Sequence, residues 1–171
     1  MVDINPVKAG GPTSYKIDKP TLADLPQLLQ LWEEQDKFHN QLDPDYYVPY
    51  ETRRTEIEGE FPKLIQEDDP HIFVAREGDK VVGFINFGKE HEPYSDTKIK
   101  EFGELKELIV TEASQNKGIG AALITAVEDY FREQGILDMK IQCSSFNKTA
   151  LALYEKRGYI SRQVLLFKRL T

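Results

Sequence analysis

The apolar residues of this chain repeat with two spacings, one typical of helices and one typical of strands. Residues 21–39 carry an apolar residue at every third or fourth position behind Thr21, a favourable N-cap, and so predict a helix. The members of this stripe are Leu22, Leu25, Leu28, Leu29 and Trp32. Residues 51–68 are more polar and predict a weaker helix, interrupted near Gly59 or Pro62.

Strand patterns fill much of the remaining chain. Two apolar runs flank a turn at 77–80 and predict a hairpin over 71–89. Further strands are predicted at 15–20, 102–110, 136–143 and 162–170. Two more helices are predicted, one after the "GIG" turn and ending at Gly135, the other between Asn147 and Gly158.

The order of these elements is β-α-α-β-β-β-α-β-α-β, which predicts an α/β domain around a mixed sheet. We expect one domain over residues 14–171. A lead-in over residues 1–13, rich in Pro and Gly, would precede it.

Composition narrows the range of functions. The formal net charge is −7, from 22 basic and 29 acidic residues, which argues against nonspecific nucleic-acid binding and permits a cationic substrate. Cys143 is the one cysteine, so an intrachain disulfide framework is excluded. No apolar run approaches the roughly 20 residues of a membrane span, and no spacing suggests a metal site. We therefore expect a cytoplasmic protein without nucleic-acid or membrane partners.

The turn "QNKGIG" between a strand and a helix is typical of a phosphate site, because glycine lets the backbone approach a ligand and the first helical N–H groups are free. A P-loop is excluded, because Lys117 precedes the glycine of the helix start. A dinucleotide fingerprint is excluded, because Leu123 stands where the third glycine is needed. A plain connecting turn remains equally compatible with the turn taken alone.

A second segment decides between these readings. The segment "NKTALALYEKRGYI" carries Asn147, Ala150, Tyr154, Gly158 and Tyr159 in the pattern N-x-x-A-x-x-x-Y-x-x-x-G-Y. Together with "ELKELIVTEASQNKGIGAALI" before it, this block resembles the GCN5-related N-acetyltransferase (GNAT) family. Lys117 departs from the arginine that many members carry, but keeps the charge. The resemblance implies a twisted, mixed, mostly antiparallel sheet of about six to seven strands with about four helices.

The resemblance also implies acetyl-CoA as cofactor. The backbone of Leu108, Ile109 and Val110 would pair with the pantetheine arm, which enters a gap between the fourth and fifth strands. The pyrophosphate would bind the backbone of the glycine turn. The residues of this turn are Gln115, Asn116, Lys117, Gly118, Ile119, Gly120 and Ala121. Asn147 and Ala150 would lie along the pantetheine arm, with Tyr154 at its reactive end.

Tyr154 would then be the general acid, since a phenol with a pKa near ~10 is a neutral donor at pH 7. Glu104 and Glu107 are the candidate bases. Regular strand alternation places Glu104 on the face of Leu108 and Glu107 on the other face, and a bulge would change this. Family members place a carboxylate near the Glu104 position, often acting through water, so Glu104 is the preferred base. A packing role for Tyr154 and plain exposure for Glu104 are the alternatives.

The acceptor is expected to meet the end of the first helix and the following loop. Glu33, His39, Tyr46 and Tyr47 are the candidates, because acids and aromatic rings suit a cationic amine. A solvated helix end is the alternative reading. We expect acetyl transfer to a small-molecule amine. The alternatives are a protein acetyltransferase, acting on N-termini or lysines, and a non-catalytic acyl-CoA-binding module. The strand at 162–170 is compatible with a homodimer through a partner's sheet edge.

Overall fold

The computed structural model describes residues 15–170, so the predicted lead-in lies outside the described residues. Its elements are, in chain order, β1 (Lys16–Asp18), the short 3₁₀ helix η1 (Leu22–Asp24), α1 (Leu25–Leu42), α2 (Tyr50–Gln66), β2 (Ile72–Glu77), β3 (Lys80–His91), β4 (Glu101–Val110), the 3₁₀ helix η2 (Glu112–Ser114), α3 (Ile119–Glu133), β5 (Met139–Ile141) and α4 (Lys148–Lys156). The expected α/β domain with a mixed sheet is confirmed.

The sheet has the order β1-β2-β3-β4-β5. Its neighbours run antiparallel except β4 and β5, which are parallel. Residues 15–170 therefore contain five strands where six to seven were expected. The prediction of a strand at 162–170 is wrong, because this segment has no regular structure and its side chains are exposed. A strand forms only where a neighbour takes up its backbone hydrogen bonds, and this segment has no such neighbour within the described chain.

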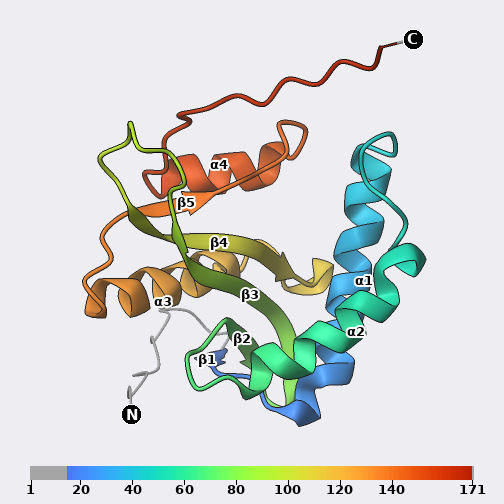
Figure 1. Cartoon of the computed structure of the whole chain (residues 1–171). Coiled ribbons are helices and arrows are strands. Elements are labelled where there is room, and N and C mark those ends of the chain that lie inside the picture. Colours follow the sequence, from blue (N-terminus) through green and yellow to red (C-terminus); the bar gives the residue numbers. More distant parts are fainter. Residues whose placement is uncertain (1–14, 171) are drawn as a thin grey trace.

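Two helical layers cover the two faces of the sheet (Figure 1). On one face, α3 and Tyr154 of α4 pack with Phe73, Phe87 and Leu105. On the other face, α1 and α2 bury Trp32 and Phe61 against the sheet. Each helix thus buries one apolar side. Within residues 15–170 no helix combines the length and the apolar character needed to cross a bilayer.

Helix α2 is continuous, so the predicted interruption near Gly59 or Pro62 is wrong. Proline removes one backbone donor and strains the preceding turn, which costs a free helix about 3 kcal/mol. Here Ile57 and Phe61 are both 2% exposed and fix this part of the helix to the core. Burial of two large side chains stabilises the helix by roughly 1.5–3 kcal/mol each and offsets that cost.

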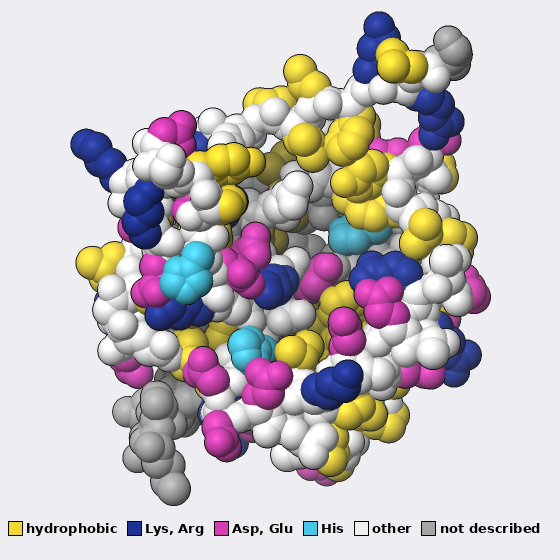
Figure 2. Space-filling view, viewed as in Figure 1, with side chains coloured by type: hydrophobic (Ala, Val, Ile, Leu, Met, Phe, Trp, Pro, Cys, Tyr) yellow, Lys and Arg dark blue, Asp and Glu magenta, His cyan; other side chains and the backbone are white. Residues whose placement is uncertain are grey.

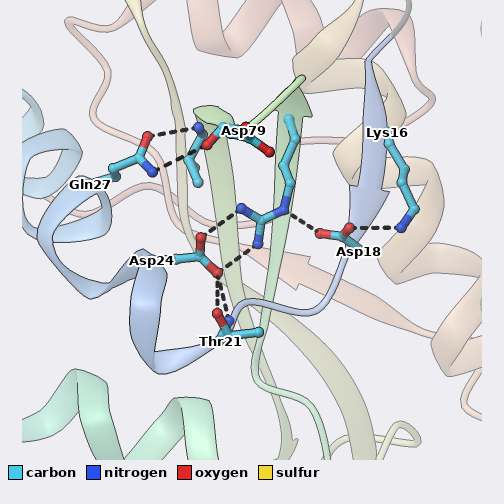
Figure 3. Close-up of polar contacts among 8 residues, drawn as sticks. Lys16, Asp18, Thr21, Asp24, Gln27 and Asp79 are labelled. Atoms are coloured by element: carbon cyan, nitrogen blue, oxygen red, sulfur yellow. Dashed lines mark hydrogen bonds and ion pairs between the residues drawn. The ribbon is translucent and has the colours of Figure 1, made fainter.

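A buried ion-pair network orients the start of α1 on the sheet (Figure 3). Arg76 of β2 donates to both carboxylate oxygens of Asp24 at 2.6 Å and to Asp18 at 2.9 Å. Asp24 also accepts from the backbone N–H of Thr21 at 2.7 Å. The hydrogen bonds from Arg76 hold the pKa of Asp24 at about 2, so this carboxylate stays charged. The side-chain oxygen of Gln27 then accepts from Val81 N–H at 2.9 Å and ties α1 to β3.

Gly103 is the closest packing point between β4, β5 and α3. A Cβ on Gly103 would overlap the ring of Phe131 and lie 2.7 Å from Met139 Sδ. We predict that Gly103→Ala lowers the free energy of unfolding by about 1–3 kcal/mol, as overpacked cores do. Urea unfolding of wild type and variant measures this change in the free energy of unfolding. Gly59→Ala is the control, because nothing lies within 4 Å of that position; it should leave stability unchanged or raise it by up to about 1 kcal/mol. Equal stability of the two variants would contradict the close packing of Gly103 against Phe131 and Met139.

Candidate functional site

Strands β4 and β5 pair over only three positions and then separate. The paired residues are Gly103 with Met139, Glu104 with Lys140 and Leu105 with Ile141. Beyond Leu105, β4 continues to Val110 and pairs only with β3. The second half of β4 therefore leaves one edge without a neighbouring strand, and this opening is the gap around which the site is built.

The backbone of β4 points hydrogen-bonding groups into this gap. Thr111 N–H donates to Val82 at 2.9 Å, toward β3. Because peptide groups alternate along an antiparallel strand, the N–H and C=O groups of Leu108 and Val110 point the other way. Gln115 confirms the direction, since its side-chain amide reaches the carbonyl of Val110 at 3.1 Å. Ile109, in contrast, directs its backbone toward β3 and buries its side chain among the α1 and α2 residues.

A β-bulge at Lys106 changes which side chains of β4 face which layer. The register with β3 runs from Glu107 opposite Asn86 to Leu105 opposite Phe87, so Lys106 is the extra residue. As a result Leu105, Leu108 and Val110 all pack with the α3 layer. Glu107 and Ile109 face the α1 and α2 layer instead. The regular alternation assumed from the sequence is therefore interrupted at this position.

The glycine turn lies at the end of β4 and presents free backbone donors. Gly118 is the N-cap of α3 with φ 82°, and Asn116 also has a positive φ of 61°. The first helical bond runs from Ala122 N–H to the carbonyl of Gly118 at 3.0 Å. The N–H groups of Ile119, Gly120 and Ala121 consequently have no intrahelical acceptor and lie at the positive end of the helix dipole. The turn from Gln115 to Gly118 is exposed, so a ligand can reach it.

Charge and packing around the turn suit an anionic group. Lys117 lies at the rim, 3.8 Å from the carboxylate of Glu77, and keeps a cation next to the free N–H groups. A Cβ on Gly120 would lie 3.6 Å from Leu153 and 3.8 Å from Leu108. The start of α3 thus lies directly beside the gap and beside α4. A ligand could contact the turn and the β4 edge at once.

Helix α4 forms the other wall of the gap. Asn147 caps this helix through its side-chain oxygen, which accepts from Ala150 N–H at 3.1 Å. Ala150 and Leu153 pack against the α3 layer, and Tyr154 is 8% exposed.

Tyr154 belongs to the apolar cluster of the α3 layer. Burial raises its pKa well above the usual range, and the charges of Cys143 and Glu107 raise it further. The phenol is thus neutral at pH 7 and remains a proton donor. Its ring meets Tyr159 edge-on at 5.9 Å. Burial also raises the pKa of the Cys143 thiol, which makes that group a poor nucleophile.

Glu107 is the most strongly perturbed carboxylate of this region. Burial raises its pKa to about 7, and the nearby charge of Asp36 adds to the rise, while Gln35 and Arg53 oppose it. The side-chain amide of Gln35 donates to Glu107. Asp36 is itself buried, with its pKa raised by burial and one oxygen 3.9 Å from Arg53. A carboxyl group whose pKa is near 7 can both accept and release a proton at neutral pH.

Glu104 lies elsewhere on β4. It sits where β4 still pairs with Lys140 of β5, before the strands separate. Alternation with Gly103 and Leu105, which face the α3 layer, turns Glu104 toward the opposite face. It is half-buried. Glu104 and Glu107 therefore share one face of the sheet, but only Glu107 lies beside the gap.

Aromatic side chains from the end of α1 and from the α1–α2 loop form the rim beyond Glu107. His39 stacks on Tyr47 with ring centroids 4.9 Å apart, and Tyr46 meets Tyr47 edge-on at 5.0 Å. Burial raises the pKa of Tyr47, a hydrogen bond with Ser144 lowers it, and the charge of Glu107 raises it. Burial lowers the pKa of His39, which favours the neutral ring. Three of the four predicted acceptor residues thus lie together.

Glu33, the fourth, does not join them. Its carboxylate pairs with Lys37 at 2.5 Å on an exposed part of α1. The sequence reading gave no role to Gln35, Arg53 or Ser144. Gln35 is one helical turn before His39, so its position on the same side of α1 was available from the spacing. The positions of Arg53 and Ser144 depend on how α2 and the β5–α4 loop fold back, for which no local pattern exists.

Comparison with known proteins gives a consistent picture. Residues 30–159 match the model of the acetyltransferase (GNAT) family. An uncharacterized N-acetyltransferase of Methanocaldococcus jannaschii, MJ1207, is 26% identical over 152 residues, 89% of this chain and 63% of that protein. The chain spans 62–63% of the length of the first curated relatives that it matches.

Solved structures share the fold. A mutant of the BH1408 protein from Bacillus halodurans superimposes with a TM-score of 0.81 at 18% identity, over 91% of this chain and 99% of that one. The aminoglycoside acetyltransferase meta-AAC0020, from an uncultured soil metagenomic sample, gives a TM-score of 0.65 at 25% identity, over 92% and 96%. The family model, which covers well over half of the chain, decides the assignment. This chain belongs to the GNAT family of acetyltransferases.

Proposed function

We propose that this protein transfers the acetyl group of acetyl-CoA to a primary amine of a small molecule. The observation that carries the proposal is the opening between β4 and β5, which Glu107 of β4 and Tyr154 of α4 approach from opposite faces of the sheet. Tyr154 packs in the same cluster as Leu108 and Val110, and the half-buried Glu107 faces the α1 and α2 layer from the same part of β4. One can accept a proton at neutral pH and the other can donate one.

The cofactor would lie along the gap. Its pyrophosphate would bind the free N–H groups at the start of α3, with Lys117 at the rim. Its pantetheine arm would pair with the backbone of Leu108 and Val110, which point into the gap, and pass Ala150 of α4. The capping bond of Asn147 leaves its amide N–H₂ available for this arm. Ile109 contributes through packing, because its backbone points to β3.

The chemical step starts from the neutral amine and needs two proton transfers. The amine nitrogen attacks the thioester carbonyl, forms the C–N bond and expels the CoA thiolate as the C–S bond breaks. The nitrogen is positively charged once the C–N bond has formed, and its extra proton goes to Glu107, directly or through a water molecule, which leaves the neutral amide. Tyr154 gives its proton to the thiolate, and the net proton gained by Glu107 returns to the phenolate through solvent. The N–H of Val110 would polarise the carbonyl oxygen as negative charge develops there.

We infer that Glu107, in preference to Glu104, is the base. The sequence favoured Glu104 because the family resemblance places a carboxylate near that position. Regular alternation put Glu104 on the face of Leu108, and the bulge at Lys106 changes this assignment of faces. Glu107 lies beside the gap with a pKa of about 7, close to the optimum for a base at neutral pH. Glu104 lies on the paired half of the strand.

A small-molecule acceptor is supported by the rim. Tyr47 of the α1–α2 loop lies near Ser144 of the β5–α4 loop, so the two loops approach each other at the rim. The carboxylates of Asp36 and Glu107 and the stacked rings of His39 and Tyr47 suit an ammonium group. The similarity to an aminoglycoside acetyltransferase points to the same class of polyamine acceptor.

Removal of the acid tests the proposal directly. We predict that Tyr154→Phe lowers kcat by about 10²-fold or more while the Kd for CoA changes less than about threefold, because the phenol acts only on the leaving thiolate. Thiol release from acetyl-CoA, measured with a panel of aminoglycosides, polyamines and amino-acid amides, gives kcat; calorimetry gives Kd.

Tyr159→Phe is the matched control. That ring lies 5.9 Å from Tyr154, and its hydroxyl bonds to Glu128 instead of facing the gap. The Tyr159→Phe variant should keep the kcat of the wild type. Undiminished turnover in Tyr154→Phe would remove Tyr154 as the acid. CoA binding without turnover of any amine by the wild type would favour a binding module.

The pH dependence tests the base. Glu107 must be ionised to accept a proton, so kcat/KM of the wild type should fall as the pH drops below about 7. We predict that Glu107→Gln lowers kcat/KM about 10²-fold and abolishes this limb of the pH profile. Glu104→Gln should keep the limb. The reverse pattern in the two variants would assign the base to Glu104.

Substitution of two glycines with similar backbone φ angles tests the binding site proposed for the cofactor. Gly118 has φ 82° and Gly135 has φ 77°, at opposite ends of α3, so Val at either costs about 1–2 kcal/mol of stability. We predict that Gly118→Val also weakens CoA binding at least tenfold, because it shifts the N–H groups that bind the pyrophosphate. Gly135→Val should bind CoA normally. Calorimetric titration with CoA measures the Kd of both variants. Equal affinities of Gly118→Val and Gly135→Val for CoA would contradict a pyrophosphate site at the glycine turn.

A further inference from the structure

The glycine turn that would hold the phosphates of the cofactor has an acidic neighbour. Glu77, the last residue of β2, places its Oε1 atom 3.8 Å from the Nζ atom of Lys117. This distance allows a contact between charges but no hydrogen bond. The same oxygen is shielded from solvent and accepts no hydrogen bond from residues 15–170. Burial of a carboxylate oxygen without a hydrogen bond is unfavourable, so Glu77 depends on the charge of Lys117.

A tyrosine hydroxyl lies beside the same turn. Tyr15 directly precedes β1, is half-buried and packs against the α3 layer. A Cβ on Gly118 would lie 3.9 Å from the hydroxyl oxygen of Tyr15. Burial raises the pKa of Tyr15, so the hydroxyl keeps its proton at neutral pH and can donate a hydrogen bond.

Strand pairing explains why Tyr15 and Glu77 meet at the start of α3. β1 pairs antiparallel with β2, with Ile17 opposite Ala75. Continuing this register by two residues places Tyr15 opposite Glu77. Ile17 and Ala75 both pack in the α3 layer. Side chains two positions apart on a strand face the same side, so Tyr15 and Glu77 point to that layer as well.

We propose that Tyr15 and Glu77 set the affinity of the glycine turn for the phosphates of the cofactor, in opposite directions. Before the cofactor binds, the carboxylate of Glu77 attracts Lys117. A phosphate at the turn draws the Lys117 ammonium to itself and accepts a hydrogen bond from Tyr15. Glu77 then faces the phosphate as a like charge, which opposes binding. This inference rests on the position of the pyrophosphate proposed above.

The influence of Glu77 should be local. The chain has a formal net charge of −7, and Figure 2 shows acidic and basic side chains interspersed over the visible face. Exposed charges further apart than about 10 Å are largely screened at 0.1 M salt. Loss of one carboxylate therefore acts mainly on groups close to it, and a carboxylate elsewhere in the same hairpin can serve as the control.

Calorimetric titration with CoA tests the two residues separately. At low ionic strength we predict that Glu77→Gln lowers the Kd for CoA about 3- to 10-fold, because a like charge is removed from beside the phosphate. At about 1 M salt this gain should fall below about twofold. Tyr15→Phe keeps the packed ring but loses the donor, so it should raise the Kd about tenfold.

Asp79→Asn is the matched control for charge. It removes the same charge from an exposed position two residues further along the hairpin, so the Kd for CoA should change less than about twofold. Pantetheine, which lacks the phosphates, is the control for the ligand. Ligand-observed NMR should give wild type, Glu77→Gln and Tyr15→Phe the same affinity for pantetheine. Circular dichroism establishes that each variant is folded.

Several results would overturn the proposal. These are unchanged or weaker CoA binding in Glu77→Gln, an equal gain in Asp79→Asn, unchanged CoA binding in Tyr15→Phe, or effects of the same size on pantetheine. Gly118→Val separates this proposal from the one on which it rests. Normal CoA affinity in Gly118→Val would overturn both. Weakened binding there, with no change in Glu77→Gln and Tyr15→Phe, would overturn only the roles of Glu77 and Tyr15.

Discussion

The bulge at Lys106 is the local constraint on which the site depends. One extra residue in β4 lets Leu105, Leu108 and Val110 face the α3 layer while Glu107 and Ile109 face the α1 and α2 layer. Without it, Glu107 would lie on the same face as Leu105 and away from Gln35. The bulge also marks the place where pairing with β5 stops. The bulge therefore places a carboxylate beside the gap.

The two helical layers contribute different halves of the site. The α3 layer supplies the free N–H groups of the glycine turn and Tyr154, and the α1 and α2 layer supplies the groups around Glu107 and Tyr47. The sheet separates these layers except where β4 and β5 diverge. The orientation of α1 is set at its start, where Asp24 binds Arg76. That buried, charged contact fixes the helix that carries Gln35, Asp36 and His39.

The sequence predicted well whatever is encoded by local periodicity. The stripe after the glycines predicted α3, and Asn147 predicted the start of α4, because caps and apolar spacing are properties of neighbouring residues. It predicted poorly what depends on distant partners. The interruption of α2 was overridden by the burial of Ile57 and Phe61, and the strand at 162–170 has no neighbour within the described chain. The bulge was invisible for the same reason, since register belongs to a pair of strands.

Glu107 and Tyr154 approach the gap from opposite faces of the sheet, and burial prepares them for opposite roles in the proposed reaction. Burial raises the pKa of both groups, that of Glu107 to about 7 and that of Tyr154 well above its usual range. For a carboxylate, this rise gives a group that is partly ionised near neutral pH and can accept a proton. For a phenol, the same rise keeps the proton on the oxygen at neutral pH, so that the group can donate it. One physical cause therefore favours a base on one side of the gap and an acid on the other.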